Sequence, residues 1–345
     1  MNPPIIMIIL SALATGTIIT MSSFHWLMAW IGLKINTLAI VPIIATPHHP
    51  RSTEAAMKYF LTQAAASSMI LFSSMTNAWH LGTWDITQLN YTPSAVLLTA
   101  ALSMKLGLAP LHFWLPEVLQ GSTLYTAFII VTWQKLAPMS LMYLTINNLN
   151  TPTLLILGLL SAVIGGWGGL NQTQTRKIMA YSSIAHLGWM ASISSIMMNI
   201  MIMSLMIYLI MTTALFFSLI LSKSKTIQDT TATWTITPIL ATIMMLSLLS
   251  LGGLPPLTGF APKWLIMEEL VTQNLIPMAT IMALSSLLSL FFYLRLTYTT
   301  ALTLSPNTTQ AKFKWRLKQM TSTSIALTSA TMTMFLLPLT PLLLL

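Results

Sequence analysis

The chain has 345 residues, of which 55% are hydrophobic and only 6% are charged, against about 25% charged in an average soluble domain. So few charges cannot cover the surface of a soluble protein of this length, which excludes a cytosolic enzyme. The absence of cysteine excludes a disulfide scaffold, a cysteine zinc site and a cysteine-ligated iron–sulfur cluster. The composition predicts an all-α, polytopic membrane protein. The net charge of +9 then indicates how the chain is oriented in the membrane and that it contacts lipids, and it does not indicate nucleic-acid binding.

Apolar stretches of about 20 residues, the length that crosses a bilayer as a helix, recur along the chain. We expect a single transmembrane domain over residues 1–345 with about eleven spans, at approximately 5–21, 25–44, 58–77, 94–119, 122–147, 153–170, 176–198, 200–222, 238–271, 275–298 and 321–345. The ninth stretch is too long for one straight crossing. These segments lack the alternation of apolar and polar residues that marks a membrane β-barrel.

The basic residues test this count, because alternate connections must lie on opposite sides of the membrane. With eleven spans, the basic residues in the connections and at the adjoining span ends all fall on the side of the N-terminus: Arg51, Lys58, Arg176, Lys177, Lys223, Lys225, Arg295, Lys312, Lys314, Arg316 and Lys318. Basic connections stay in the compartment of synthesis, so the N-terminus is predicted inside and the C-terminus outside. The densest basic run, 312–318, is interpreted as an anchor before the last span, with anionic headgroups as an alternative ligand.

A weak internal repeat relates two segments of the chain. Residues 107–119 (GLAPLHFWLPEVL) align without gaps with residues 253–265 (GLPPLTGFAPKWL), and six positions are identical. The two copies lie in the fourth and ninth expected spans, which cross the membrane in opposite directions. Such a pair is typical of an inverted-topology repeat. We expect repeat units of approximately 1–147 and 153–298, followed by a C-terminal helix at 321–345.

Each copy contains a proline next to a glycine deep in an apolar stretch. Proline cannot donate an intrahelical hydrogen bond, and the carbonyl groups that it frees must find partners within the protein or in water. Each copy therefore predicts a discontinuous helix that lines a polar cavity near the membrane midplane. A plain proline kink explains either copy alone, whereas two matching copies in opposite orientations favour a transport site.

Four lysines lie within the expected spans, namely Lys34, Lys105, Lys135 and Lys263. A lysine at the centre of a span costs about 2.5–3.5 kcal/mol on insertion scales, which makes it a functional candidate. Burial favours the neutral amine and so allows the group to exchange protons. The alternative is that the long side chain reaches an interface, which fits Lys263 better than Lys105 or Lys135.

Two histidines and one glutamate extend this polar set. His112 lies in the first break, and His186 lies in the seventh span beside small hydroxyl residues. Histidine titrates near neutrality and relays protons, although a lone histidine in a membrane is equally well explained by packing. Glu117 occupies the repeat position of Lys263, and is a candidate partner at the edge of the cavity or an interfacial residue. Glu54 is expected to pair with Lys58 at the start of the third span.

The sequence lacks the glycine-rich nucleotide motifs and shows no histidine–glutamate spacing that predicts a metal site. We therefore expect this chain to bind no cofactor and no metal.

Four runs of the sequence carry a resemblance to a known family. They are residues 51–60 (RSTEAAMKYF), 104–118 (MKLGLAPLHFWLPEV), 166–174 (GWGGLNQTQ) and 250–264 (SLGGLPPLTGFAPKW). The chain resembles the chain 2 family of NADH–ubiquinone oxidoreductase, or respiratory complex I, in its mitochondrially encoded vertebrate form. The last run is shared by antiporter-like subunits in general, and the resemblance covers essentially the whole chain. Vertebrate members lack three N-terminal helices of their bacterial relatives, which fits eleven spans.

The resemblance implies a proton-translocating subunit of the membrane arm, with an axis of buried residues at Lys105, Lys135, Lys263, His112 and His186. It places the chain in the mitochondrial inner membrane, with the N-terminus in the matrix and the C-terminus toward the intermembrane space. NADH, FMN, iron–sulfur clusters and ubiquinone are then expected in other subunits of the complex. The implied partners are other membrane-arm subunits, including neighbouring antiporter-like chains, and anionic lipids such as cardiolipin.

One residue departs from the family pattern. The family has a glutamate in the second span that pairs with the lysine of the fourth span, whereas this sequence has Lys34 at that position. Two ammonium groups repel each other where the family has an ion pair. Either Lys34 or Lys105 is then neutral much of the time, or an anion or water screens them.

Two other functions fit the same pattern. The first is a stand-alone cation/proton antiporter, which would purify alone rather than only within a large assembly. The second is a structural membrane-arm subunit with impaired pumping, for which Lys34 is the main argument. A dry axis between Lys105 and Lys263 would favour this structural role.

Overall fold

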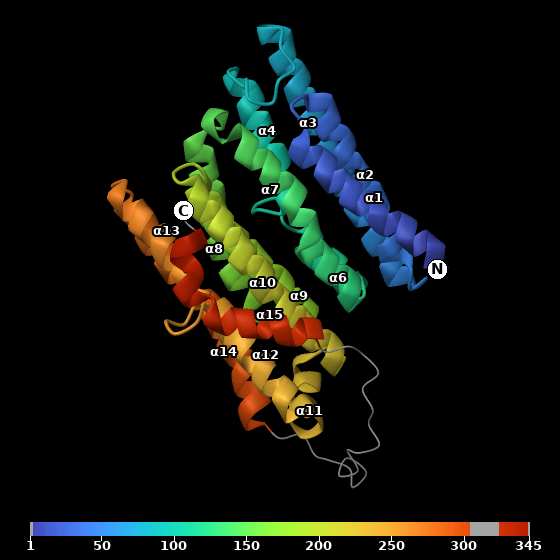
Figure 1. The fold of residues 1–345 in the computed structure, drawn as a ribbon, viewed down its shortest axis with the longest axis vertical. Coiled ribbons are helices and arrows are strands. Elements are labelled where there is room, and N and C mark those ends of the chain that lie inside the picture. Colours follow the sequence, from blue (N-terminus) through green and yellow to red (C-terminus); the bar gives the residue numbers. More distant parts are fainter. Residues whose placement is uncertain (1–2, 304–323, 344–345) are drawn as a thin grey trace. The chain divides into compact units, whose positions relative to one another are not determined.

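The computed structural model describes residues 3–303 and 324–343, and this part of the chain is built of α-helices and short 3-10 turns (Figure 1). The basic run at 312–318 lies outside the described residues. The chain divides into two compact units, Met1–Ser161 with Leu187–Met198, and Ala162–His186 with Asn199–Leu345.

The first unit begins with three consecutive helices that pack against one another, α1, α2 and α3. Its helices are α1 (Pro3–Ser22), α2 (Trp26–Ala45), α3 (Pro50–Leu81), α4 (Thr92–Leu106), α5 (Trp114–Gly121), α6 (Leu124–Val131) and α7 (Trp133–Thr145), followed by the 3-10 turn η1 (Ile146–Asn148). Helix α3 also packs on α4 and α5, while α7 contacts α1, α2 and α4. This arrangement places the polar residues of α2, α3, α4 and α7 around one interior region.

Two helices, α8 (Thr151–Gly169) and α9 (Thr175–Ser194), contribute residues to both units. The second unit contains most of α10 (Met198–Ser222) and, after it, α11 (Ile227–Ile236), α12 (Pro238–Gly252), α13 (Phe260–Thr272), α14 (Ile276–Leu302), α15 (Ser324–Phe335) and the 3-10 segment η4 (Leu337–Leu343). Helix α14 packs against α11, α12 and α13, and α12 also contacts α15. The short helix α11 was not expected from the sequence.

Six helical segments in the described part of the chain are long and apolar enough to cross a membrane: Pro3–Ser22, Trp26–Ala45, Leu124–Asn148, Thr151–Gly169, Met198–Ser222 and Ile276–Leu302. Three shorter apolar helices, α4, α12 and α15, do not reach the length of a span by themselves. Helices α4 and α12 are short because each stops at a predicted break. Helix α3 is long enough at 32 residues, but it carries many polar side chains and is absent from the six.

Both breaks lie where the sequence repeat predicts them. Helix α4 ends at Leu106, followed by Gly107 with φ 79°, and the chain resumes as α5 at Trp114. Helix α12 ends at Gly252, followed by Gly253 with φ 81°, and the chain resumes as α13 at Phe260. A left-handed residue directly after a helix is a common stop signal, and glycine adopts that conformation at no steric cost. The aligned glycines thus end two helices in the same way.

Candidate functional site

The structure places the predicted site residues in two clusters, one in each unit. The first unit holds Lys34 on α2, Lys105 on α4, Lys135 on α7, His112 in the first break and Glu117 on α5. The second unit holds His186 on α9 and Lys263 on α13.

Lys135 is the most deeply buried of the described lysines, with 1% of its surface exposed. Its Nζ donates a short hydrogen bond to the carbonyl oxygen of Leu106, the last residue of α4. The same Nζ lies 5.6 Å from the centre of the Trp114 ring. A cation is stabilised both at the C-terminal end of a helix and over the face of an aromatic ring. Lys135 therefore contacts the two features of the first break that attract positive charge.

Trp114 is held in place beside the end of α4. Its Nε1 donates a 3.0 Å hydrogen bond to the carbonyl oxygen of Met104, and its ring meets the ring of Tyr59 edge-on at 5.8 Å. The ring that faces Lys135 is thus fixed from two sides, by α4 and by α3.

A small cavity lies next to Lys105 and Lys135 and has room for roughly one water molecule. Its lining residues are Leu33, Asn36, Thr37, Tyr59, Gln63, Lys105, Trp114, Ile130, Gln134, Lys135, Ala137 and Pro138. Three amides of this lining have buried nitrogens without a hydrogen-bond partner, namely Asn36, Gln63 and Gln134. The amide oxygen of Asn36 is also without a partner, so the cavity is polar and three of its four unpartnered buried atoms are donors.

Lys34 occupies a different environment from the other lysines of this cluster. Its Nζ lies 5.5 Å from the centre of the Trp30 ring, one helical turn earlier on α2. Lys34 interacts electrostatically with Lys105, and the interaction is one between like charges. Both ion pairs found in the described part of the chain belong to Lys58, so neither gives Lys34 an acidic partner.

His112 lies between α4 and α5 and is buried, with 4% of its surface exposed. Its ring packs against the ring of Phe113, 4.4 Å away between centres. The same segment contains a cis peptide bond between Ala109 and Pro110. His112 thus belongs to the broken segment itself rather than to a regular helix.

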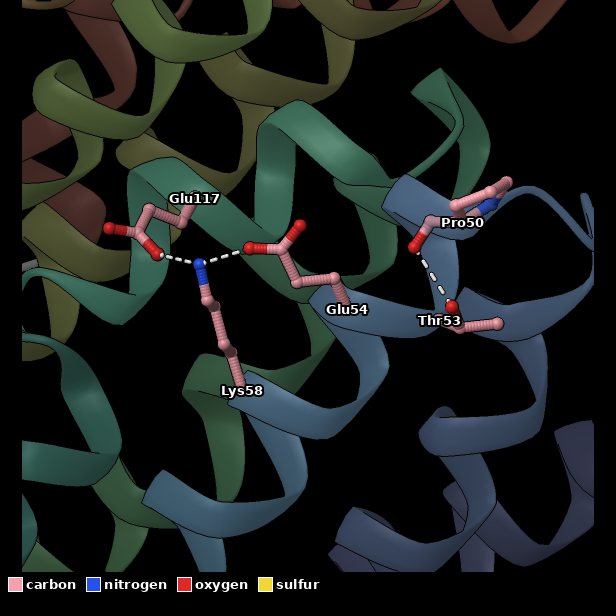
Figure 2. Close-up of polar contacts among 5 residues, drawn as sticks. All are labelled: Pro50, Thr53, Glu54, Lys58 and Glu117. Atoms are coloured by element: carbon pink, nitrogen blue, oxygen red, sulfur yellow. Dashed lines mark hydrogen bonds and ion pairs between the residues drawn. The ribbon is translucent and has the colours of Figure 1, made fainter.

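Glu117 contacts none of the four lysines of the expected spans through an ion pair in the described structure. Its carboxylate lies 2.6 Å from the Nζ of Lys58, which also lies 2.5 Å from the carboxylate of Glu54 (Figure 2). The side chains are exposed, at 42% for Lys58, 52% for Glu117 and 61% for Glu54. The predicted pair of Glu54 and Lys58 is confirmed. Through Glu117, Lys58 also links α3 to α5.

The hydrogen bond from Lys58, together with its positive charge, holds the pKa of Glu54 below its ordinary value. Figure 2 shows the ammonium of Lys58 between the two carboxylates. Glu54 lies in the second turn of α3, outside the expected third span.

In the second unit, Lys263 donates a 2.8 Å hydrogen bond from Nζ to the carbonyl oxygen of Gly252, the last residue of α12. The side chain is buried, with 8% of the residue exposed. Lys263 lies on α13, the helix after the break, and its hydrogen bond therefore links α13 back to the end of α12.

His186 lies near this lysine and interacts with it electrostatically. Its Nε2 is 3.5 Å from the hydroxyl oxygen of Tyr293, and its ring lies 5.5 Å from the ring of Tyr208. Both tyrosines are almost fully buried, at 1% exposed or less. The second cluster therefore joins a histidine, a lysine and two phenol groups from four helices.

The sequence interpretation missed the residues that surround the lysines: Asn36, Tyr59, Gln63, Trp114, Gln134, Tyr208 and Tyr293. The amides are a usable signal, because an uncharged but strongly polar side chain in an apolar helix also requires a partner. The aromatic residues give no such signal, since they are equally common as core and interface residues of membrane proteins.

The titratable groups of these clusters can exchange protons. The sequence has no cysteine, and the described residues contain no group of three or more His, Cys, Asp or Glu that could hold a metal ion. The titratable groups present are ammonium, imidazole and phenol, which accept and donate protons.

Comparison with known proteins decides the family. Residues 23–289 match the family model for the transmembrane region of NADH:quinone oxidoreductases and Mrp antiporters, and residues 290–344 match the model for the NADH dehydrogenase subunit 2 C-terminus. NADH-ubiquinone oxidoreductase chain 2 of Varanus timorensis is 54% identical over 342 residues, with 99% of each chain covered. The chain belongs to the NADH-ubiquinone oxidoreductase chain 2 family. The chain 2 protein of Danio rerio is 55% identical over 342 residues, covering 99% of this chain and 98% of its own.

Solved structures show the same fold as this chain 2 family member. A chain of respiratory complex I from Thermus thermophilus superposes with a TM-score of 0.85 at 25% identity, covering 99% of this chain and 79% of that one. A chain of the Mrp complex from Dietzia sp. has a TM-score of 0.85 at 16% identity, covering 97% and 75%. The fold is therefore that of antiporter-like membrane subunits, and the resemblance read from the four sequence runs is confirmed.

Proposed function

We propose that this chain translocates protons as a membrane-arm subunit of the proton-pumping NADH:ubiquinone oxidoreductase. The observation that carries the proposal is the pair of buried ammonium groups at the two helix breaks. Lys135 donates to the last carbonyl of α4, and Lys263 donates to the last carbonyl of α12. Membership of the chain 2 family supports assembly into an NADH:ubiquinone oxidoreductase.

The proton path runs along Lys105, Lys135, His186 and Lys263, with His112 beside the first break. A lysine that gives up its proton becomes a poorer donor, so the carbonyl that it holds is released. Water then enters or leaves the break, because the freed carbonyl needs another partner. Proton transfer and local hydration are coupled in this way at each break.

The energy comes from quinone reduction elsewhere in the complex, and it alters hydration and pairing along the path. Protons load from the matrix and leave toward a neighbouring antiporter-like subunit or the intermembrane space. NADH, FMN, the iron–sulfur clusters and ubiquinone are bound by other subunits, and no cofactor is assigned to this chain.

The proposed topology is eleven spans with inverted repeat units of approximately 1–147 and 153–298. The segments 94–119 and 238–271 each cross once as a broken helix, so that α4 with α5 and α12 with α13 form single spans. The N-terminus then lies in the matrix and the C-terminus toward the intermembrane space of the inner mitochondrial membrane. Anionic lipids such as cardiolipin are proposed at the basic matrix face.

The test replaces Lys135 by methionine in the assembled complex reconstituted in liposomes. The number of protons pumped per NADH oxidised is expected to fall, because methionine fills the same space without a titratable group. Lys135→Arg is the matched control, since it keeps the charge and the hydrogen-bond donors while giving up no proton. Unchanged stoichiometry in the methionine variant would overturn the proposal.

One observation favours a second function, that of a structural subunit with impaired pumping. Lys34 faces Trp30 and has no acidic partner among the described ion pairs, where the family pattern has a glutamate. The variant Lys34→Glu separates the two functions. If the variant pumps many more protons per NADH than the unmodified complex, pumping by the unmodified complex is impaired. If the two complexes pump equally, the unmodified complex already translocates protons actively.

A further inference from the structure

Three of the four buried unpartnered side-chain atoms in the cavity beside Lys105 and Lys135 are hydrogen-bond donors. Its lining includes two lysines and no aspartate or glutamate. Lys34 is partly exposed and does not line the cavity, but it adds a third positive charge that interacts with Lys105. A buried cluster of like charges is stable only if the charges are screened by an opposite charge or are lost by deprotonation.

Three amide groups strengthen this imbalance. The side-chain nitrogens of Asn36, Gln63 and Gln134 are buried and make no hydrogen bond. The amide oxygen of Gln134 accepts from the hydroxyl of Tyr59 at 3.4 Å, so its nitrogen is the end left without a partner. Asn36 is 1% exposed and Gln63 is 4% exposed, which excludes bulk water as their partner. Unpaired buried donors require an acceptor.

We propose that this cavity binds one small monovalent anion, with chloride as the physiological class of ligand. The anion accepts hydrogen bonds from the amide nitrogens and screens Lys105 and Lys135. It supplies a negative charge that no aspartate or glutamate of the lining provides. This inference deepens the proposed function, because it names what keeps the lysines of the path in their charged form.

An anion fits these donors better than the other small occupants. A cation is repelled by the lysines, and among the buried unpartnered atoms of the lining it finds one oxygen, that of the Asn36 amide. One water molecule accepts two hydrogen bonds and must also place its own two protons. A halide accepts from several donors at once and needs no acceptor in return. The cavity has room for one small occupant.

The direct test is anomalous diffraction from crystals of the assembled complex in which bromide replaces chloride. A bromide peak is expected in the cavity between Asn36, Gln63 and Gln134. The variant Lys34→Glu should lose the peak, because its carboxylate replaces the anion. Lys225→Glu is the matched control, since it makes the same charge change at an exposed residue and should keep the peak. A cavity without bromide in the unmodified complex overturns the proposal.

A second measurement covers the case in which Lys34→Glu fails to assemble. Gln63→Glu places a carboxylate within the cavity lining and should likewise exclude bromide. Proton pumping is then compared in chloride and in gluconate, an anion too large for the cavity. The unmodified complex should pump fewer protons per NADH in gluconate, and the Gln63→Glu complex should pump equally in both. Equal pumping of the unmodified complex in both salts argues against the anion.

These results separate the anion from the proton path. If Lys135→Met leaves pumping unchanged while the bromide peak is present, the proposed function fails and the anion site stands. If Lys135→Met lowers pumping and no bromide binds, the proton path stands and the anion site fails.

Discussion

The Nζ of Lys263 lies 2.8 Å from the carbonyl oxygen of Gly252, the residue at which α12 ends. Lys135 makes the corresponding contact with Leu106, where α4 ends. Gly252 and Leu106 directly precede the two glycines that the internal alignment matches. The same carbonyl of each broken helix is therefore held by a buried ammonium, although the two lysines come from non-matching positions of the repeat.

Replacing Lys263 by methionine should lower both pumping and stability. The carbonyl of Gly252 loses its donor, and an unsatisfied buried polar group costs about 1–3 kcal/mol. Thermal unfolding of the complex and protons pumped per NADH are the measurements. Lys263→Arg keeps a cationic donor and is the control, which should retain more of the stability than of the pumping. Equal thermal stability of the methionine variant and the parent would show that the contact contributes nothing.

Gly253→Ala should lower proton pumping by more than backbone strain alone would. Gly253 has φ 81°, and an added Cβ would lie 3.0 Å from both Cδ and Nζ of Lys263. Gly82→Ala is the matched control, because Gly82 has φ 73° and open space where a Cβ would be added. Both variants bear the left-handed strain of about 1–2 kcal/mol, and the alanine at 253 also displaces the lysine. Protons pumped per NADH should fall at 253 and stay unchanged at 82; equal effects would contradict this account.

Glu117→Gln should weaken the attachment of α5 to α3 in a way that depends on salt. The pair with Lys58 is exposed, so its contribution is small and is screened as ionic strength rises. Thermal midpoints of the parent and the variant should therefore differ more at low salt than at high salt. Glu54→Gln removes the other carboxylate without detaching α5, since Glu54 lies on the same helix as Lys58. A salt-independent difference would exclude an electrostatic role.

The pH dependence of this cluster follows from the lowered pKa of Glu54. Its folded pKa is depressed by the hydrogen bond and charge of Lys58, so the unfolded chain binds the proton more readily. The stabilisation is thus present above the ordinary carboxyl pKa and is lost as the pH falls through the lowered folded value. Titration of the thermal midpoint should show this loss in the parent and not in Glu54→Gln. A parallel curve for the two proteins would contradict the assignment.

Arg295→Lys should destabilise the second unit despite keeping the charge. The guanidinium donates from two nitrogens to the carbonyl oxygens of Leu170 and Gln172, each at 2.5 Å, just beyond the end of α8. An ammonium is a single point donor and cannot hold two carbonyls in this forked geometry. We expect a loss of about 1 kcal/mol, measured as a lower thermal midpoint of the assembled complex. Lys225→Arg, a reciprocal change at an exposed residue, should leave the midpoint unchanged.

Much of the fold depends on residues that are close together in the chain, and it can therefore be predicted from the sequence. Apolar stretches predict helices, and the glycine and proline pairs at 107–110 and 253–256 predict where two of them stop, because these residues act through their own backbone. The Glu54–Lys58 pair is predicted for the same reason, since residues four apart meet on any helix. Burial of Lys105, Lys135 and Lys263 also follows from their apolar neighbours.

The partners of these groups depend on helices that are distant in the sequence, and only the tertiary structure decided them. The repeat aligns Glu117 with Lys263, yet Glu117 pairs with the exposed Lys58, and Lys135 from α7 takes the carbonyl in the first unit. Helix packing sets which side chain reaches a given carbonyl, and a local sequence pattern cannot predict that contact. The sequence by itself thus determined where the helices break and that Lys105, Lys135 and Lys263 are buried, whereas packing left Lys34 partly exposed and determined which charge meets which break.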